Sequence, residues 1–594
     1  MMFRRGRGGR PYFFNQTGVP VWRIHILLVF FLLSGGLILL QLFRIQVLKH
    51  QAYLAQAQEQ YQIFREVQPK RGEIYWQDLA SRGIASLVIN KPVYNFFVVP
   101  KLIKEPSQTA VLLVSIFPDK SADILAKINR RDDPYALVET SLENQAKEKI
   151  SQILERAKWP ADTYGFEEEL KRYYLENGLG GHLTGFLGIA ADGKTRSGQY
   201  GLEEYYDDLL RGQAGLIEAD KDASGRPIAI GRRIVKPAQD GADIILTIDR
   251  NIQYKSCQAL AERVAEFQAT GGTVIVMNPA DGSIYALCNY PTFDPNNYQA
   301  VAMGNFVDPS LANSYEPGSV FKPITMAAAI DQKAVTPRTS YLDTGAVVID
   351  KYTIGNAHSK IYGQSTMSDV LDKSINTGAI FAFRAVGQEN FRHYVNNFGF
   401  GKLTGIELAG ESDGDVHTLD LNQEIYYATS SFGQGITVTP MQLITAYAAI
   451  ARGGRLVKPT IIKSLKINGV LKNLPLQEIG QVISPETAET MSAMLTSVIE
   501  NGFTKRAQVP GYKMAGKTGT AQIPNAGEKG YSEETIHTFV GFGPVGDGMP
   551  AFVILVKLDK PQTVPFADSS SAPLFAEIAK FILDYLQIPP QTSP

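Results

Sequence analysis

The chain has 594 residues, of which 44% are hydrophobic and 20% charged, with 58 lysines and arginines against 59 aspartates and glutamates. This balance supports buried cores in roughly three or four domains and excludes a mostly disordered chain. A net charge of -1 gives no reason to expect nucleic-acid binding. Two cysteines, Cys257 and Cys288, are too few for a disulfide-stapled scaffold or a Cys-rich metal site. They could pair, but the expected arrangement is two separate thiols packed in a core.

The stretch Ile24–Phe43 predicts a membrane-spanning helix. It lies between Arg23 and Arg44 and contains no residue that is charged at pH 7. Its one histidine, His25, is neutral at that pH. A helix of this length crosses the hydrocarbon core of a bilayer. A cleaved signal peptide would have a shorter apolar region with small residues at a cleavage site close behind it. The sequence therefore favours an uncleaved anchor.

The charges that flank this stretch predict its orientation. Five arginines precede it: Arg4, Arg5, Arg7, Arg10 and Arg23. The near cations after it are Arg44 and Lys49. Because the more basic short flank stays in the cytoplasm, we expect residues 1–23 to be a cytoplasmic tail and residues 24–43 the anchor. The rest of the chain is then extracytoplasmic.

Residues 44–235 have a mixed and irregular pattern. The charged stretches Leu142–Trp159 and Phe166–Glu176 predict helices that alternate with Gly-rich turns. Lys236–Gly241 has the composition of a linker. A domain boundary is therefore expected near residue 235.

The pattern is regular from residue 236 to residue 590. Asp249 is expected to cap a helix that follows a short strand, Asp243–Ile248. Further strands are expected at Thr273–Met277, Ser283–Tyr290, Lys513–Gln522, His537–Gly543 and Ala551–Leu558. Helices are expected at Val320–Gln332, Ser368–Val386, Met441–Arg452 and Leu574–Leu586. This order predicts an α+β domain, with a helical block inserted into an antiparallel sheet.

Several common functional motifs are absent or out of context. Gly188–Thr195 fits the phosphate-loop pattern, but Gly198 and Gly201 follow where that motif needs a helix. Gly541–Gly546 fits a dinucleotide fingerprint, but it lies at the end of one predicted strand and leads into another. The seven histidines lack metal-ligand spacing, and no nucleophile elbow stands out. We therefore expect no metal, no cofactor and no Ser-His-Asp triad.

A serine and a lysine three residues apart are the first element of a candidate active site. Pro323 is tolerated only in the first turn of a helix, so the helix must begin near Ser319. Lys322 then lies one turn after Ser319 on the same face. A serine hydroxyl becomes a nucleophile when a neighbouring base takes its proton, and a neutral lysine can be that base. The bare spacing also occurs by chance in most long proteins.

Two further elements follow in the chain. The second is Ser374-Ile375-Asn376, within the helical block. The third is Lys517-Thr518-Gly519-Thr520, in a small-residue strand that a ligand can approach closely. Its lysine and threonines offer one positive charge and hydroxyl donors, which suit a substrate carboxylate. Each element alone could be an ordinary helix face or edge strand, but their order is specific.

The ordered triple resembles the signature of the penicillin-binding-protein and serine β-lactamase superfamily. Similarity to the class B penicillin-binding proteins extends to DIILTIDRNIQ, NPADGSIYALCNYPTFDPNNY, SYEPGSVFKP, SFGQGITVTPMQL, MAGKTGTAQ and HTFVGFGP. RGEIY and GQYGLEEYYDDLLRGQAG resemble the non-catalytic pedestal of that class. Trp76–Gly83 departs from the family's short Asp-Arg-Asn-Gly turn. The resemblance implies a pedestal (dimerisation-type) domain at 44–235 and a transpeptidase domain at 236–590, with helices on both sides of its sheet.

The resemblance also implies a reaction and the roles of the site residues. The protein would be a peptidoglycan D,D-transpeptidase of the bacterial plasma membrane that cross-links stem peptides and is acylated by β-lactams. Ser319 would attack the D-Ala–D-Ala carbonyl and Lys322 would accept its proton. Ser374 would pass a proton to the leaving amine, Asn376 would orient the substrate amide, and Lys517 would add positive field. Lys517 would thereby also disfavour protonation of Lys322.

The strand that carries the third element would bind the substrate. Thr518, Gly519 and Thr520 would form the site for the terminal carboxylate. The backbone N–H groups of Ser319 and Thr520 would form the oxyanion hole.

The sequence is compatible with several alternatives. YEPGS and the ending APLFAEIAKFILDYLQIPP resemble the septal type of class B protein more than the elongation type. A β-lactamase would need a deacylating base that the sequence does not reveal, and a sensor without activity would not need Ser319, Lys322 and Lys517 intact. The acidic motif of a glycosyltransferase is absent from Gln51–Val235. A membrane-embedded glycan polymerase and cell-division proteins are therefore expected as partners.

Overall fold

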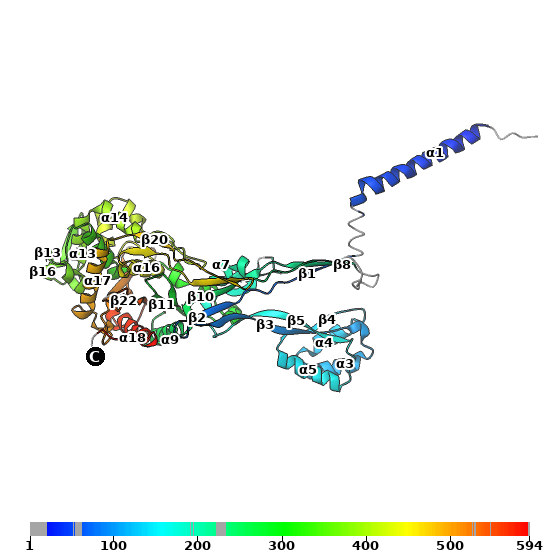
Figure 1. The fold of residues 1–594 in the computed structure, drawn as a ribbon, viewed down its shortest axis with the longest axis horizontal. Coiled ribbons are helices and arrows are strands. Elements are labelled where there is room, and N and C mark those ends of the chain that lie inside the picture. Colours follow the sequence, from blue (N-terminus) through cyan, green and yellow to red (C-terminus); the bar gives the residue numbers. More distant parts are fainter. Residues whose placement is uncertain are drawn as a thin grey trace, which may run out of the picture. The chain divides into compact units, whose positions relative to one another are not determined.

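The computed structural model describes residues 21–51, 53, 62–190, 192–193, 195–220, 233–525, 527, 530–546 and 548–591. Four of the arginines that predict a cytoplasmic tail, Arg4, Arg5, Arg7 and Arg10, lie outside these residues. Contacts divide the chain into two units (Figure 1). The first comprises Met1–Gln68 with Ala214–Ala238, and the second Pro69–Gln213 with Gln239–Pro594.

The first unit contains the apolar helix and a small sheet. Helix α1 (Val21–Phe43) continues as a π-helical turn, Arg44–Leu48. Among the described residues, Val21–Leu48 is the one helix that is long and apolar enough to cross a membrane. The predicted helix is thus confirmed, and it continues beyond Phe43. The sheet is antiparallel, in the order β1 (Gln62–Val67), β8 (Gly215–Asp220) and β9 (Arg233–Lys236).

The second unit begins with a seven-stranded sheet in the order β19-β18-β10-β2-β3-β4, with β5 also paired to β3. Its strands are β2 (Ile74–Asp78), β3 (Gly83–Val98), β4 (Ala136–Leu142), β5 (Tyr164–Tyr174), β10 (Asp243–Asp249), β18 (Ile462–Ile467) and β19 (Val470–Asn473). Three helices pack their apolar residues against β3 and β4: α3 (Pro106–Ile116), α4 (Ser121–Ile128) and α5 (Asn144–Arg156). Helix α5 confirms the prediction for Leu142–Trp159.

The prediction of a helix at Phe166–Glu176 is wrong. This segment belongs to β5, which pairs with the long strand β3 from Val88↔Tyr174 to Val98↔Tyr164. Glu, Lys and Leu favour helices locally, but pairing with a neighbouring strand outweighs that preference. The alternation confirms a strand, because Arg172 and Tyr174 are buried while Lys171 and Tyr173 are exposed.

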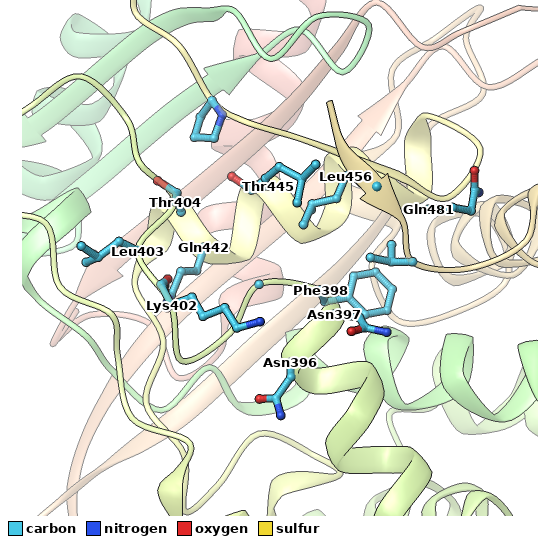
Figure 2. A pocket seen from close by; sticks show the side chains of 15 residues that line it. Asn396, Asn397, Phe398, Lys402, Leu403, Thr404, Gln442, Thr445, Leu456 and Gln481 are labelled. Atoms are coloured by element: carbon cyan, nitrogen blue, oxygen red, sulfur yellow. Dashed lines mark hydrogen bonds between the residues drawn. The ribbon is translucent and has the colours of Figure 1, made fainter. Parts of the chain in front are cut away.

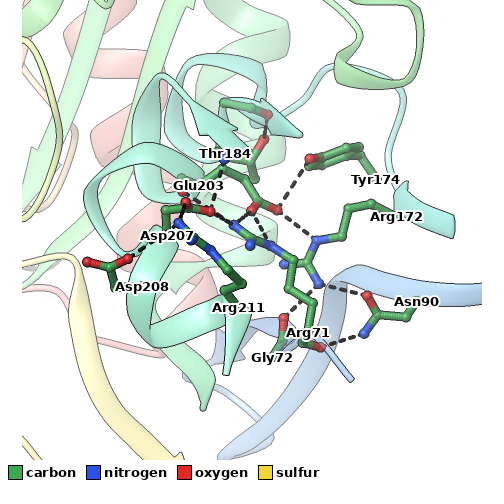
Figure 3. A network of polar contacts seen from close by, with 12 residues as sticks. Arg71, Gly72, Asn90, Arg172, Tyr174, Thr184, Glu203, Asp207, Asp208 and Arg211 are labelled. Atoms are coloured by element: carbon green, nitrogen blue, oxygen red, sulfur yellow. Dashed lines mark hydrogen bonds and ion pairs between the residues drawn. The ribbon is translucent and has the colours of Figure 1, made fainter. Parts of the chain in front are cut away.

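A buried ion-pair network holds this region together (Figure 3). Glu203 is fully buried and accepts hydrogen bonds from Arg71 Nε (2.8 Å) and Arg172 Nε (2.7 Å). Arg172 also donates to the carbonyl oxygen of Gly72 (2.6 Å), and Arg71 pairs with Asp207 (2.8 Å). Burial alone would raise the pKa of Glu203, but the two guanidinium groups outweigh it, so the pKa is lowered.

Short elements follow this network along the chain. They are α6 (Gly181–Thr184), β6 (Phe186–Ile189), β7 (Arg196–Gln199), α7 (Gly201–Tyr205) and α8 (Asp207–Arg211). The false phosphate-loop match lies in the β6–β7 hairpin, so no helix follows it.

A five-stranded antiparallel sheet forms the centre of the remaining chain, in the order β12-β11-β23-β22-β21. The strands are β11 (Gly271–Met277), β12 (Ile284–Tyr290), β21 (Ala515–Pro524), β22 (Tyr531–Gly543) and β23 (Phe552–Asp559). All five match predicted strands. Every side chain of β11 is buried, because successive residues enter cores on opposite faces: Val274 and Val276 on one, Ile275 and Met277 on the other.

Helices cover both faces of this sheet, as predicted. One face carries α9 (Arg250–Glu266) and α18 (Ser571–Tyr585). The other carries α16 (Pro440–Ala451) and α17 (Pro485–Glu500), and α11 (Lys322–Asp331) packs against α17. Asp249 caps α9 by accepting from the backbone N–H groups of Asn251 and Ile252, both at 2.9 Å. Local capping and amphipathic patterns thus predict α9, α11, α16 and α18. Helix α17 was not among the predicted helices.

The helical block and its ribbons lie between β12 and β21 in sequence. Its helices are α10 (Pro309–Ala312), α12 (Met367–Asp372), α13 (Asn376–Val386), α14 (Gln388–Asn397) and α15 (Glu424–Ser430). Its two-stranded ribbons pair β13 (Ser340–Asp343) with β16 (Gly363–Thr366), β14 (Ala346–Ile349) with β15 (Tyr352–Gly355), and β17 (Arg455–Val457) with β20 (Glu478–Gln481). This block confirms the predicted α+β organisation.

The two cysteines correct a second prediction. Cys257 on α9 and Cys288 on β12 form a disulfide, with their Cα atoms 5.2 Å apart. They were expected to pack as separate thiols. The two cysteines are 31 residues apart in sequence, so only the packing of the helix against the strand brings the two sulfur atoms together.

Candidate active site

Ser319 lies in a tight turn that leads into α11. The 3-10 turn Gly318–Phe321 passes directly into the helix at Lys322, which agrees with the predicted start near Ser319. Gly318 has φ +60, a conformation that favours glycine, and its N–H donates to the carbonyl oxygen of Gly433 (3.0 Å). The Ser319 side chain is half-buried, and its hydroxyl makes no hydrogen bond within the described residues. It is therefore available to a ligand.

Lys322 is almost completely buried, with 1% of its surface exposed. Its Nζ donates to the carbonyl oxygen of Ser374 (2.6 Å) and lies 3.1 Å from the Ser374 hydroxyl. Burial and the positive charge of Lys517 hold the pKa of Lys322 well below its ordinary value. The neutral amine, which can accept a proton, is thereby favoured.

Ser374 occupies a break between two helices, which corrects the prediction of one helix over Ser368–Val386. α12 ends at Asp372, α13 begins at Asn376, and Ser374 has φ +55. A non-glycine residue in this region costs backbone energy, so the packing around it must hold it there. In this conformation both oxygens of Ser374 reach Lys322.

Asn376 opens helix α13 and is half-buried. Its side-chain Nδ2 donates to the carbonyl oxygen of Gly355 (3.0 Å), at the end of β15. The β14–β15 ribbon is therefore attached to the same segment that carries Ser374.

Strand β21 brings the third element beside the turn Gly318–Phe321. Lys517 is 1% exposed, and burial lowers its pKa to about 8. A Cβ atom on Gly519 would lie 2.9 Å from the carbonyl oxygen of Pro317, so a side chain there would push the strand away from Ser319. Thr518 and Thr520 are half-buried on the opposite face of the strand from Lys517. The Thr520 Oγ1 accepts the N–H of Ala567 (3.1 Å).

The structure thus brings the three predicted elements to one place. Lys322 contacts Ser374 directly, Lys517 is close enough to affect its charge, and β21 packs against the turn that holds Ser319. The arrangement offers a hydroxyl nucleophile, a buried amine with a lowered pKa and a glycine-containing edge strand.

Sequence reasoning did not single out Glu316, three residues before Ser319. Its Oε1 accepts the N–H of Gly435 (2.9 Å) and the hydroxyl of Tyr531 (3.3 Å), so the segment that leads into the turn Gly318–Phe321 is joined to a neighbouring loop and to β22. Burial raises its pKa. The segments that contain Glu316 and Gly435 do occur among those that resemble the family, but no local pattern indicates their contact.

A cavity of about 320 Å³ lies elsewhere in the second unit (Figure 2). Asn396, Lys402, Gln442 and Leu456 are among the residues that line it, and none of the predicted site residues does so. The side-chain nitrogen of Gln442 already donates to the carbonyl oxygens of Lys402 and Asp413, so these hydrogen bonds are made within the protein. Within the described residues no group of three or more His, Cys, Asp or Glu side chains could hold a metal ion.

Comparisons with known proteins agree with this geometry. A family model described as the penicillin binding protein transpeptidase domain matches residues 272–580, and one described as the penicillin-binding protein dimerisation domain matches residues 66–246. Stage V sporulation protein D of Bacillus subtilis is 32% identical, over 88% of this chain and 79% of its own length. Penicillin-binding protein PbpB of Mycolicibacterium smegmatis is also 32% identical, over 80% of this chain and 74% of its own.

Solved structures show the same fold. Penicillin binding protein 3 of Mycobacterium tuberculosis, complexed with aztreonam, superposes with a TM-score of 0.67 at 25% identity, over 89% of this chain and 98% of the other. Penicillin Binding Protein 2X of Streptococcus thermophilus has a TM-score of 0.75 at 22% identity, over 89% of this chain and 81% of its own. The chain belongs to the class B penicillin-binding proteins, the family of peptidoglycan D,D-transpeptidases.

Proposed function

We propose that the protein cross-links stem peptides through an acyl-enzyme on Ser319. The observation that carries this proposal is the buried contact between Lys322 and Ser374, at 3.1 Å between Nζ and Oγ, beside Lys517. Lys322 takes the proton of Ser319 as its oxygen attacks the carbonyl carbon of the penultimate D-Ala. The peptide C–N bond then breaks, and the leaving D-Ala amine receives a proton by way of Ser374.

The second half of the reaction uses the same groups. The amine of a second stem peptide attacks the acyl-enzyme, gives up a proton and releases Ser319. Asn376 orients the donor amide, while the N–H groups of Ser319 and Thr520 stabilise the oxyanion. The terminal carboxylate of the donor lies beside Lys517, Thr518, Gly519 and Thr520. A β-lactam enters the first half-reaction in the same way, and the acyl-enzyme then persists.

Labelling with a fluorescent penicillin tests this mechanism. Mass spectrometry of the digested protein should place a single adduct on the peptide that contains Ser319, and Ser319→Ala should remain unlabelled. An adduct on another residue would contradict the mechanism. The rate at which the label is lost separates a transpeptidase from a β-lactam-hydrolysing relative of the same fold. A hydrolase would hydrolyse the labelled acyl-enzyme rapidly, whereas a transpeptidase would keep the label.

We also propose that α1 anchors the protein with its N-terminus in the cytoplasm. Its apolar sequence, Arg23 in its first turn and the four more distal arginines support this orientation. Protease added to spheroplasts should digest the catalytic domain and leave the Arg-rich tail protected. Protection of the catalytic domain would reverse the topology.

Two finer points complete the proposal. The non-catalytic pedestal occupies 44–235 and the transpeptidase domain 236–590. The matched family ranges, 66–246 and 272–580, support this order of domains, although the first range extends past residue 235. The protein acts in septal wall synthesis with a membrane-embedded glycan polymerase and cell-division proteins; the elongation type is the alternative. A relative from Mesostigma viride that is named peptidoglycan D,D-transpeptidase FtsI homolog is 29% identical over 96% of both chains. Depletion should therefore give filamentous cells, whereas rounded cells would indicate the elongation type.

A further inference from the structure

A buried histidine, His537, lies opposite Thr520 on the neighbouring strand β22. In the β21–β22 pairing, Thr520 is opposite His537, so their side chains are on the same face. His537 is fully buried. Its Nδ1 lies 2.8 Å from the hydroxyl oxygen of Ser570, and its Nε2 lies 3.0 Å from that of Thr535. Burial lowers its pKa to about 4, so the ring is neutral at ordinary pH.

Ser570 is the last residue of a short segment that contacts Thr520. This segment, Phe566–Ser570, contains the 3-10 turn Ala567–Ser569 and leads into α18. Ser570 and Ala567 are both fully buried. The N–H of Ala567 donates to Thr520 Oγ1 at 3.1 Å. His537 therefore holds one end of a segment whose other end contacts a proposed substrate-binding hydroxyl.

The contact with Ala567 determines what the Thr520 hydroxyl can do. A hydroxyl group has one hydrogen to donate and two lone pairs that accept. Because Ala567 donates to one lone pair of Thr520, the hydroxyl hydrogen remains for an acceptor. A carboxylate has only acceptors, so a hydroxyl arranged in this way is suited to bind it.

We propose that His537 and Ser570 are positioning residues that hold Ala567 against Thr520 and so set the Thr520 hydroxyl as a donor to the substrate carboxylate. This inference rests on the carboxylate-binding role proposed above for Thr520. Neither residue touches the substrate. The same segment also reaches a second element, because the ring of Phe566 meets the ring of His358 edge-on at 5.6 Å.

A purely structural role for the pair would have different consequences. His537 and Ser570 also join β22 to the start of α18, and a loss of that junction would lower stability and affect all substrates alike. The readout must therefore compare two substrates that differ only in the carboxylate. Penicillin and the same penicillin with its carboxylate amidated are such a pair.

The central variant is Ser570→Ala, which removes the hydroxyl that His537 holds. We expect its acylation by penicillin to fall about five- to tenfold, as for one lost neutral hydrogen bond, and its acylation by the amidated compound to change less than about twofold. Ser569→Ala is the matched control, since Ser569 lies in the same turn and its hydroxyl makes no hydrogen bond within the described residues. It should behave like the unaltered protein.

His537 is tested by two substitutions in the full-length protein. His537→Asn places an amide near the position of Nδ1 and should keep most of the preference for penicillin, whereas His537→Leu removes it and should match Ser570→Ala. Thermal melting of each variant shows whether it has folded. If Ser570→Ala folds and slows both substrates equally, or neither, the positioning role is wrong.

One more variant separates this inference from the function on which it rests. Thr520→Val removes the hydroxyl itself, and Thr520→Ser keeps it. If Thr520→Val shows no selective loss on penicillin, then the carboxylate-binding role of Thr520 is wrong. If Thr520→Val shows the selective loss and Ser570→Ala does not, only the positioning role fails.

Discussion

The side-chain nitrogen of Lys322 lies 2.6 Å from the carbonyl oxygen of Ser374 and 3.1 Å from the hydroxyl oxygen of the same residue. An ammonium group has three N–H donors and no lone pair, whereas a neutral amine keeps two donors and gains an acceptor. The neutral amine can therefore donate to the Ser374 carbonyl and still accept the proton of Ser319. Burial and the nearby charge of Lys517 both favour this neutral form.

The first prediction concerns the pH dependence of acylation. The reactive form needs neutral Lys322 and charged Lys517. The pKa of Lys322 is lowered, so the rate should rise with pH as Lys322 loses its proton, and fall again as Lys517 loses its own near a pKa of about 8. Stopped-flow acylation by penicillin across pH measures this profile, whose two limbs belong to the coupled pair. A rate that keeps rising well above pH 8 would contradict it.

The second prediction concerns Asn376, whose side-chain nitrogen donates to the carbonyl oxygen of Gly355. Asn376→Asp replaces this donor by a carboxylate, which repels the carbonyl oxygen and any substrate carboxylate. We expect acylation to slow by at least about tenfold, since an acceptor that loses its donor costs about 1–3 kcal/mol. Hydrogen exchange in β15 should accelerate at the same time. Unchanged exchange in β15 would mean that the contact does not hold the ribbon.

The third prediction concerns the disulfide between Cys257 and Cys288. Replacing both residues by serine should lower the free energy of unfolding by up to about 4 kcal/mol, because the unfolded chain loses a cross-link that spans 31 residues. Acylation of Ser319 should be unaffected, since neither cysteine is among the site residues. The melting temperature of the unaltered protein should fall when a reductant is added, whereas that of the double variant should not. If the reductant lowered the melting temperature of both proteins equally, its effect would not come from reduction of this disulfide.

The fourth prediction concerns the buried network around Glu203 (Figure 3). Glu203→Gln leaves Arg71 and Arg172 without their shared carboxylate and should cost about 3–5 kcal/mol of unfolding free energy. Glu143→Gln is the control, because Glu143 pairs with Lys91 at an exposed site and should have little effect. Denaturant unfolding measures both. A loss for Glu203→Gln no larger than for the control would show that the network is not stabilising.

The same network predicts a loss of stability in acid. The pKa of Glu203 is lowered in the folded protein, so its contribution is fully present above the pKa of an unfolded glutamate. That contribution is lost as the pH falls towards the lower folded-state pKa. The difference in stability between the unaltered protein and Glu203→Gln should therefore shrink as the solution is acidified.

Local sequence patterns predict the features that depend on neighbouring residues. Pro323 restricts where a helix can begin, and so places Ser319 and Lys322 in consecutive turns of the chain. Asp249 caps α9 through backbone N–H groups two and three residues away. The strands of the five-stranded sheet follow from short apolar runs and their turns. The order of the three motifs indicated the family, because each motif is a local sequence pattern.

Features that depend on residues distant in sequence arise only in the folded protein. Strand β5 forms because β3 pairs with it, although its charged residues favour a helix. The helix breaks at Ser374, whose carbonyl oxygen accepts a hydrogen bond from the distant Lys322. Cys257 pairs with Cys288 only because α9 packs against β12. His537 looks like an ordinary strand residue until Ser570 is brought to it. Burial, charge coupling and long-range hydrogen bonds arise only when these segments meet, so no local pattern contains them.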